Sequence, residues 1–347
     1  MSSSASVSAT SALRRLGSRR HVIPAATPSM RLACNAYTQL DVSPATQSRT
    51  SLNQNDAMMP PMVITHANGF HKELWEPVLA RLDPRWAPPE MFAIDCRNQG
   101  DSAILNKNVL EDTFEWITYA KDVLRTVDAL GLKKPLGMGH SFGANAIIMA
   151  EILRPGTFSA IIAIDPTMFP SQVNLKGPHD GHPLAQLTLK RRDHWKSREE
   201  ARRKLMEKKL FAFWHPEVLD LYLKHGLVDS TLKDGSSGVT LKTPKFQEAA
   251  TFAAEDSAAY DAFDRLNEIS IPVHIIAGEN SEVNPPDLVD LKVARCKHGS
   301  VDVLKDAGHL FPMDSPAVTA ECISTFLERF AHSQQDLTSA QRRGSKL

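Results

Sequence analysis

The chain has 347 residues, its 40 basic side chains balance its 40 acidic ones, and 42% of its residues are hydrophobic. This composition supports one large folded domain, while a formal charge of zero gives no support for binding to nucleic acid or to a charged membrane surface. No apolar run approaches the roughly 20 residues of a membrane-spanning helix, so a membrane span is not expected. The 4 cysteines and 13 histidines lack metal-ligand spacing, and neither a metal nor another cofactor is expected.

Residues 1–55 are expected to form a disordered or irregular lead, in which residues 31–40 could hold an early strand. The first 40 residues are rich in serine and contain no acid. Their arginines are Arg14, Arg15, Arg19, Arg20 and Arg31. Such a composition is typical of a mitochondrial transit peptide, so import into mitochondria is one expected location.

From residue 56 onward, short apolar runs alternate with helical patterns. Residues 56–168 and 268–332 are expected to form the two parts of one core. The expected strands are 62–65, 91–94, 136–139, 160–164, 272–277 and 301–304, and the expected helices include 72–82, 113–130, 144–153 and 316–330. Short apolar strands separated by helices indicate an α/β fold with a mostly parallel central sheet and helices on both faces.

Residues 169–267 break this alternation. The segment is polar, rich in Lys, Arg and Glu, and has no clean strand, so it is expected to be an inserted helical cap or lid. Within it, residues 190–209 carry ten Lys or Arg against four Asp or Glu. That run is either a solvated helix face or a docking face for an acidic group such as the phosphates of coenzyme A. Residues 333–347 are expected to form a flexible tail.

A GxSxG motif occupies residues 139–143, where a predicted strand runs directly into a predicted helix. This context is typical of the nucleophile elbow of the α/β-hydrolase fold, in which a sharp turn holds the serine in strained backbone angles at the edge of the sheet. The flanking residues must be glycine because a Cβ there would collide with the neighbouring strand or helix. Ser141 is therefore predicted to be the nucleophile of a serine hydrolase.

The segment HANG at residues 66–69 follows the strand 62–65, where hydrolases of this class carry a His-Gly loop. A backbone N–H of Asn68 or Gly69 is expected to form the oxyanion hole together with the N–H of Phe142. Residues 95–102 (DCRNQGDS) resemble a loop that has an architectural role in the same class.

The general base is expected just beyond the last strand, and His309 in the segment DAGHLFP is the predicted base. The acid stays open between two carboxylates. Such hydrolases usually place an Asp after the penultimate strand, but Ser281 stands at that position and Glu282 follows it. The other candidate, Asp165, ends the preceding strand and is favoured because the two strand ends lie side by side. Either carboxylate would orient the imidazole and stabilise its cation.

The last three residues, Ser345, Lys346 and Leu347, form the tripeptide of peroxisomal import. They predict a peroxisomal import receptor as a partner. One specified C-terminal tripeptide is rare by chance, whereas basic, serine-rich ends are common, so the peroxisomal matrix is favoured over the mitochondrion.

These motifs resemble those of the peroxisomal α/β hydrolases of fungi, a family that includes a yeast lipase-like enzyme and hydrolases of AK-toxin-type gene clusters. The shared features, from residue 62 to residue 347, are the His-Ala-x-Gly-Phe-type loop, the elbow, a penultimate strand without its Asp, and the import tripeptide. The resemblance implies hydrolysis of a fatty-acyl-like ester or thioester and, more distantly, a part in the synthesis of a host-selective toxin or another secondary metabolite. A transacylase with the same triad and a non-catalytic binding protein stay open as alternatives.

Overall fold

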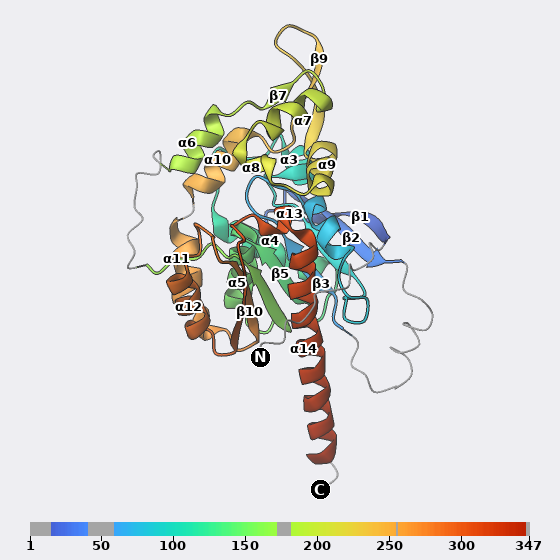
Figure 1. Cartoon of the computed structure of the whole chain (residues 1–347), viewed down its shortest axis with the longest axis vertical. Coiled ribbons are helices and arrows are strands. Elements are labelled where there is room, and N and C mark those ends of the chain that lie inside the picture. The colour runs from blue at the N-terminus through green and yellow to red at the C-terminus, as the bar shows by residue number, and fades with distance from the viewer. Residues whose placement is uncertain (1–14, 41–58, 172–181, 255, 345–347) are drawn as a thin grey trace, which may run out of the picture.

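A computed structural model of the chain describes residues 15–40, 59–171, 182–254 and 256–344. Its centre is an eight-stranded sheet with the order β1-β2-β4-β3-β5-β6-β10-β11 (Figure 1). The strands are β1 (Leu16–Pro24), β2 (Arg31–Gln39), β3 (Met62–Thr65), β4 (Met91–Ile94), β5 (Leu136–His140), β6 (Ala160–Ile164), β10 (Val273–Gly278) and β11 (Gly299–Leu304). The β1–β2 and β2–β4 pairs are antiparallel, and all pairs from β4 to β11 are parallel. The mostly parallel sheet that the sequence predicts is confirmed.

Helices cover both faces of this sheet. One face carries α4 (Trp116–Ala129), α5 (Phe142–Leu153), α11 (Asp256–Asp264) and α12 (Pro286–Arg295), and the other carries α2 (Glu76–Leu79) and α14 (Pro316–Gly344). Successive residues of a strand point to opposite faces, so Ile161 of β6 packs with the first set and Ile162 packs with the second. This three-layer arrangement is the α/β-hydrolase fold.

The early strand expected within residues 31–40 is confirmed as β2, whereas the expectation of an irregular lead is wrong for residues 16–24, which form β1 and pair with β2 as an antiparallel hairpin. The reason is that β2 has two apolar faces to bury. Leu32 and Cys34 pack on one side of the sheet, and Tyr37 packs on the other, where its hydroxyl donates to Glu76 at 2.9 Å. Arg19, Arg20 and Arg31 therefore belong to a hairpin of the folded core, while residues 1–14 and 41–55 lie outside the described residues.

Residues 182–254, between β6 and β10, form a cap above the sheet (Figure 1). Its helices are α6 (Pro183–Lys190), α7 (Arg198–Met206), α8 (Lys209–Ala212), α9 (Pro216–His225) and α10 (Lys245–Ala253). The expected helical cap is present, but the expectation that it has no strand is wrong, because β7 (His194–Trp195), β9 (Ser237–Leu241) and β8 (Leu227–Thr231) form a three-stranded antiparallel sheet. These strands are short and half-exposed, so they leave no apolar run that the sequence could reveal.

The cap is joined to the core by an apolar cluster and by a buried group of charges. Trp214 of the cap packs edge-on against Phe70, with ring centres 5.3 Å apart. The buried ammonium of Lys72, which begins the 3₁₀ turn Lys72–Trp75, lies 2.9 Å from Asp95 and 2.8 Å from Asp101. Lys242, directly after β9, reaches Asp101 from the cap side at 2.5 Å. The segment 95–102 thus links core and cap.

The C-terminal helix α14 corrects the expectation of a flexible tail. It runs without interruption from Pro316 to Gly344 and extends away from the body of the protein (Figure 1). Its first half is held by apolar side chains such as Ile323, Leu327 and Phe330, which pack under the sheet. The proposed import tripeptide, residues 345–347, lies outside the described residues.

Candidate active site

The candidate nucleophile lies in a strained turn between β5 and α5. Ser141 has φ 57° and ψ −121°, a backbone conformation that residues other than glycine rarely adopt. A Cβ at Gly139 would lie 2.4 Å from Oγ1 of Thr65, and one at Gly143 would lie 2.6 Å from the carbonyl oxygen of His66. The two glycines therefore let the elbow press against the end of β3, which fixes the position of the serine hydroxyl.

Three side chains from distant parts of the chain form one hydrogen-bonded line. Nε2 of His309 lies 2.9 Å from Oγ of Ser141, and Nδ1 of His309 lies 2.5 Å from Oδ2 of Asp165. Ser141 follows β5, Asp165 follows the adjacent β6, and His309 lies in the loop after β11. Because the carboxyl ends of parallel strands meet at one edge of the sheet, the topology brings these three residues together.

Asp165 is fully buried, and donors surround its carboxylate. Besides His309, the hydroxyl of Ser281 donates to Oδ2 at 2.5 Å, and the backbone N–H of Gly278 donates to Oδ1 at 3.2 Å. Burial acts to raise the pKa of Asp165, but the hydrogen bond and positive charge of His309 outweigh it, so the pKa lies below its ordinary value. The alternative acid, Glu282, is exposed, and nothing in the described structure joins it to His309.

Ser281 is the residue that stands where related hydrolases carry their Asp. It now supplies a hydroxyl to Asp165 rather than a carboxylate to His309. This contact was missed from the sequence, although the absence of Asp at that position pointed to a different acid. The residue is 5% exposed, and its oxygen also accepts from the N–H of Asn284 at 3.2 Å.

Two further side chains contact the site: Thr167 belongs to no motif, and His140 occupies a variable position of the elbow. Oγ1 of Thr167 lies 3.0 Å from Oγ of Ser141, so a second hydroxyl contacts the candidate nucleophile. Nε2 of His140 donates to the carbonyl oxygen of His309 at 2.9 Å, which fixes the backbone of the candidate base. Burial and the nearby charge of His309 lower the pKa of His140 to about 3, so His140 is neutral and has a positioning role.

The expected oxyanion hole is corrected at one residue. The backbone N–H of Gly69 donates to Oε1 of Gln99 at 2.8 Å, so it is not free to bind an oxyanion. Within the described part of the chain, the N–H groups of Asn68 and Phe142 have no hydrogen-bond acceptor. Phe142 is the first residue of α5, where the helix dipole also favours a negative charge. Asn68 and Phe142 thus stay as the candidate donors.

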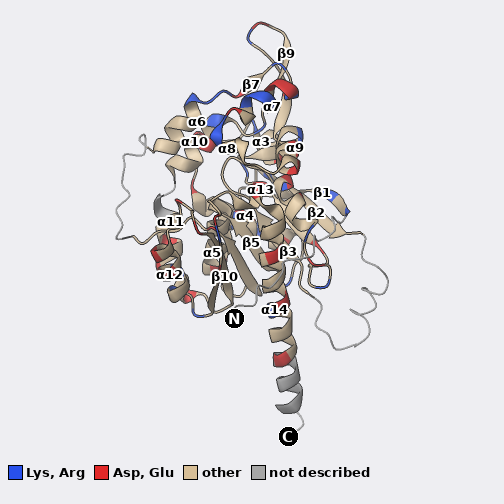
Figure 2. Ribbon diagram, in the orientation of Figure 1, with Lys and Arg blue, Asp and Glu red and all other residues tan. Residues whose placement is uncertain are grey.

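Six of the ten basic side chains of residues 190–209 form ion pairs with carboxylates, which Figure 2 shows interspersed among the basic residues. The ion pairs are Arg191–Glu248, Arg192–Glu200, Arg198–Asp229, Arg202–Asp220, Arg203–Glu207 and Lys204–Glu207. This pairing favours the interpretation of a solvated helix face over that of a docking face for phosphates.

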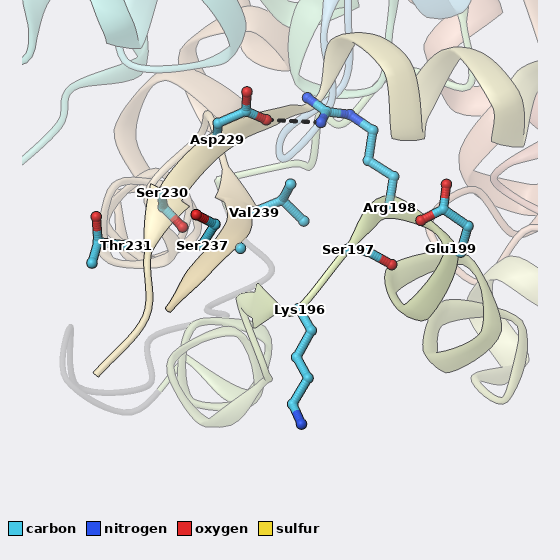
Figure 3. A pocket seen from close by; sticks show the side chains of 10 residues that line it. Lys196, Ser197, Arg198, Glu199, Asp229, Ser230, Thr231, Ser237 and Val239 are labelled. Atoms are coloured by element: carbon cyan, nitrogen blue, oxygen red, sulfur yellow. Dashed lines mark hydrogen bonds and ion pairs between the residues drawn. The ribbon is translucent and has the colours of Figure 1, made fainter. Parts of the chain in front are cut away.

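A surface pocket of about 600 Å³ lies within the cap, between the start of α7 and the β8–β9 hairpin (Figure 3). The ion pair of Arg198 with Asp229 spans it, whereas Lys196 points away from the other lining residues. None of its lining residues contacts Ser141, His309 or Asp165. The pocket is therefore separate from the candidate active site.

No group of His, Cys, Asp and Glu suitable for a metal occurs among the described residues, and none of their helices is long and apolar enough to cross a membrane. All four cysteines are free thiols.

The chain belongs to the alpha/beta hydrolase family, whose model matches residues 62–322. The fold and the class of protein expected from the elbow motif are confirmed.

Three fungal proteins are similar to this chain in sequence. The type I acyl-CoA thioesterase mpaH of Penicillium brevicompactum is 28% identical over 233 residues, covering 60% of this chain and 53% of that protein, so the chain spans about half of its length. The peroxisomal membrane protein LPX1 of Saccharomyces cerevisiae is 23% identical, and the match covers 88% of this chain and 82% of the length of LPX1. The abhydrolase domain-containing protein AFT2-1 of Alternaria alternata is 27% identical over 57% of this chain and 85% of its own.

The crystal structure of the yeast peroxisomal alpha-beta-hydrolase Lpx1 has the same fold. It aligns with a TM-score of 0.74 at 21% sequence identity, covering 96% of this chain and 98% of the yeast chain. The expected resemblance to the peroxisomal α/β hydrolases of fungi is thereby confirmed.

Proposed function

We propose that this protein is a peroxisomal serine hydrolase that cleaves an ester or thioester of a fatty-acyl-like small molecule. In this proposal Ser141 is the nucleophile, His309 the general base and Asp165 the acid of a triad. The observation that carries it is the unbroken hydrogen-bonded line from the elbow serine to the buried carboxylate. A relative named as an acyl-CoA thioesterase supports the substrate class, and a relative named as peroxisomal supports the location, as does the C-terminal tripeptide.

The first half of the reaction would acylate Ser141. Its hydroxyl donates to Nε2 of His309, and Nδ1–H of His309 donates to Asp165, which is the tautomer that a general base requires. As Oγ attacks the carbonyl carbon, His309 takes the proton and Asp165 stabilises the imidazolium. The N–H groups of Asn68 and Phe142 would receive the developing oxyanion. The imidazolium then protonates the departing alcohol or thiol, which leaves an acyl-enzyme.

The second half would release the acid. His309 removes a proton from water, and the resulting nucleophile attacks the acyl carbon through the same oxyanion hole. Collapse of the intermediate returns the proton from His309 to Oγ of Ser141 and frees the carboxylic acid. A fatty-acyl-like substrate is compatible with the apolar cluster in which Phe211 and Trp214 of the cap pack with Phe70, on the loop that carries Asn68.

The test measures turnover of two matched substrate series, p-nitrophenyl esters and acyl-CoA thioesters of increasing chain length, with the wild type and with Ser141→Ala. The wild type should hydrolyse one series with a clear chain-length optimum and should be labelled by a fluorophosphonate. Ser141→Ala should lose both turnover and labelling while its circular dichroism spectrum stays unchanged. Labelling that persists in the variant would exclude Ser141 as the nucleophile.

The same assay separates the two alternative functions. A wild type that is folded but neither turns over substrate nor reacts with the fluorophosphonate would support a non-catalytic binding protein. Acyl transfer to an added alcohol or amine that greatly exceeds hydrolysis would support a transacylase. A role in the synthesis of a toxin or another secondary metabolite rests on the family resemblance and stays a prediction.

A further inference from the structure

A lysine outside the triad lies entirely inside the protein, behind Asp165. Lys292, on α12, has no exposed surface. Its ammonium donates to the carbonyl oxygen of Pro166 at 2.8 Å and to the side-chain oxygen of Asn284, and it lies 5.7 Å from the centre of the Phe169 ring. Across the described residues no carboxylate is within ion-pair distance of this ammonium.

A buried ammonium that has only neutral partners is costly to keep in a folded protein. Burial lowers the pKa of Lys292 to about 7, although the negative charge of Asp165 acts in the opposite direction. Asp165 is the charged group that faces the ammonium, and His309 lies just beyond it. An aliphatic side chain would fill the same space at lower cost, so the ammonium requires a specific explanation.

The turn that Lys292 holds carries two groups of the site. Residues 165–167 follow β6; Asp165 accepts from His309, and Thr167 contacts Oγ of Ser141. Asp165 has φ 40°, a strained conformation that persists only when its surroundings enforce it. Pro166, between them, has no N–H, so its carbonyl oxygen is the backbone group through which a neighbouring element can hold it.

We propose that Lys292 is a positioning residue, whose ammonium fixes the 165–167 turn so that Asp165 is aimed at His309 and Thr167 at Ser141. The inference rests on the proposed function, because it requires Asp165 to be the acid of the triad. Lys292 touches neither the substrate nor the reacting atoms. It acts by holding the carbonyl oxygen of Pro166 and by placing a positive charge beside the carboxylate.

The two contributions can be separated with two substitutions. Lys292→Met removes both the donor and the charge, whereas Lys292→Gln removes the charge but retains an N–H donor. Lys292→Met should lower kcat by about 10- to 100-fold with KM changed by less than about two-fold, because the turn is misplaced rather than the substrate site. Lys292→Gln should lose less. Lys297→Met, at an exposed lysine just after α12, is the matched control and should behave as the wild type.

The pH profile of kcat/KM provides a readout that a merely structural role would not change. A positive charge beside Asp165 disfavours the protonated form of His309, so both substitutions should move the acid limb of the profile to higher pH. Lys292→Met with a kcat within about three-fold of the wild type, or with an unchanged acid limb, overturns the proposal. The proposal is also overturned if Lys292→Met and Lys292→Gln lose kcat equally and this loss is explained by their lowered thermal stability alone.

A third variant covers the case in which Lys292→Met does not fold. Asn284→Ala removes the other acceptor of the ammonium and should lower kcat, by a smaller factor, without changing KM. An unchanged kcat would overturn the proposal. Failure of the proposed function is distinguishable, because it would appear in the wild type as absent fluorophosphonate labelling, or in Asp165→Asn as retained activity.

Discussion

Asp165→Asn should disable the triad, because the carboxylate of Asp165 acts only as an acceptor, whereas the side chain of Asn also carries an NH₂ donor. Oδ2 accepts from His309 and from Ser281, and Oδ1 accepts from the N–H of Gly278. If the NH₂ of an Asn faces Nδ1 of His309, the imidazole proton is forced to Nε2, the atom that must accept from Ser141. If the NH₂ faces Gly278 instead, it opposes the backbone N–H of Gly278, and two donors meet in a fully buried place.

The expected size of the loss follows from that geometry. A neutral amide can neither select the productive tautomer nor stabilise the imidazolium, and burial prevents water from replacing the carboxylate. The loss in kcat should therefore be about 10⁴-fold, which corresponds to about 5 kcal/mol of transition-state stabilisation. The substrate does not contact Asp165 in this mechanism, so KM should change little.

The assay compares kcat of Asp165→Asn and Glu282→Gln on one ester substrate. Glu282 is exposed, so its substitution should cost only a few-fold and serves as the matched control. Losses in the reverse order would transfer the role of the acid to Glu282 and refute the reasoning. Equal and modest losses would indicate that Ser141 and His309 act as a dyad.

Three further predictions concern stability and location. The free energy of unfolding should fall as the pH drops below about 6.5, because burial lowers the pKa of His140 to about 3 and the unfolded chain then binds more protons than the folded one. Urea titrations at several pH values should show that His140 contributes up to about 1.4 kcal/mol per pH unit to this fall, and His140→Asn should reduce it. Gly139→Ala should destabilise the fold by about 1–3 kcal/mol because its Cβ would lie 2.4 Å from Oγ1 of Thr65, whereas Gly308→Ala meets no atom within 4 Å and should be nearly neutral in the same denaturation assay. A fluorescent protein fused to the N-terminus should collect in peroxisomes and disperse when residues 345–347 are deleted, while mitochondrial fluorescence of a C-terminal fusion would indicate dual targeting.

The parts of the site that the sequence predicts are those with a local signature. The elbow requires two glycines around Ser141 between a strand and a helix, and this pattern is visible within a few residues. His309 follows from its place after the last strand. The preference for Asp165 over Glu282 depended on the adjacency of two strand ends, which the β6–β10 pairing provides.

Contacts between distant segments were not predictable in the same way. Gln99 removes Gly69 from the oxyanion hole, and Thr167 contacts Ser141, but neither contact has a fixed spacing in the sequence. The strands of the cap are too short for their periodicity to be recognised, and β1 is a mostly exposed or half-exposed strand in a segment whose arginines indicated a leader. In each case tertiary packing, rather than local preference, determines the structure.

The position of Asp165 at the end of β6 has a consequence for the timing of activity during synthesis. Ser141 and Asp165 belong to the compact unit β5-α5-β6, whose contacts are local and can form while the ribosome is still translating the cap. His309 emerges only after the cap, β10 and β11 have been made. Under the proposed mechanism, a nascent chain would thus hold the nucleophile and the acid but not the base, and would stay inert towards esters until almost the whole polypeptide had left the ribosome.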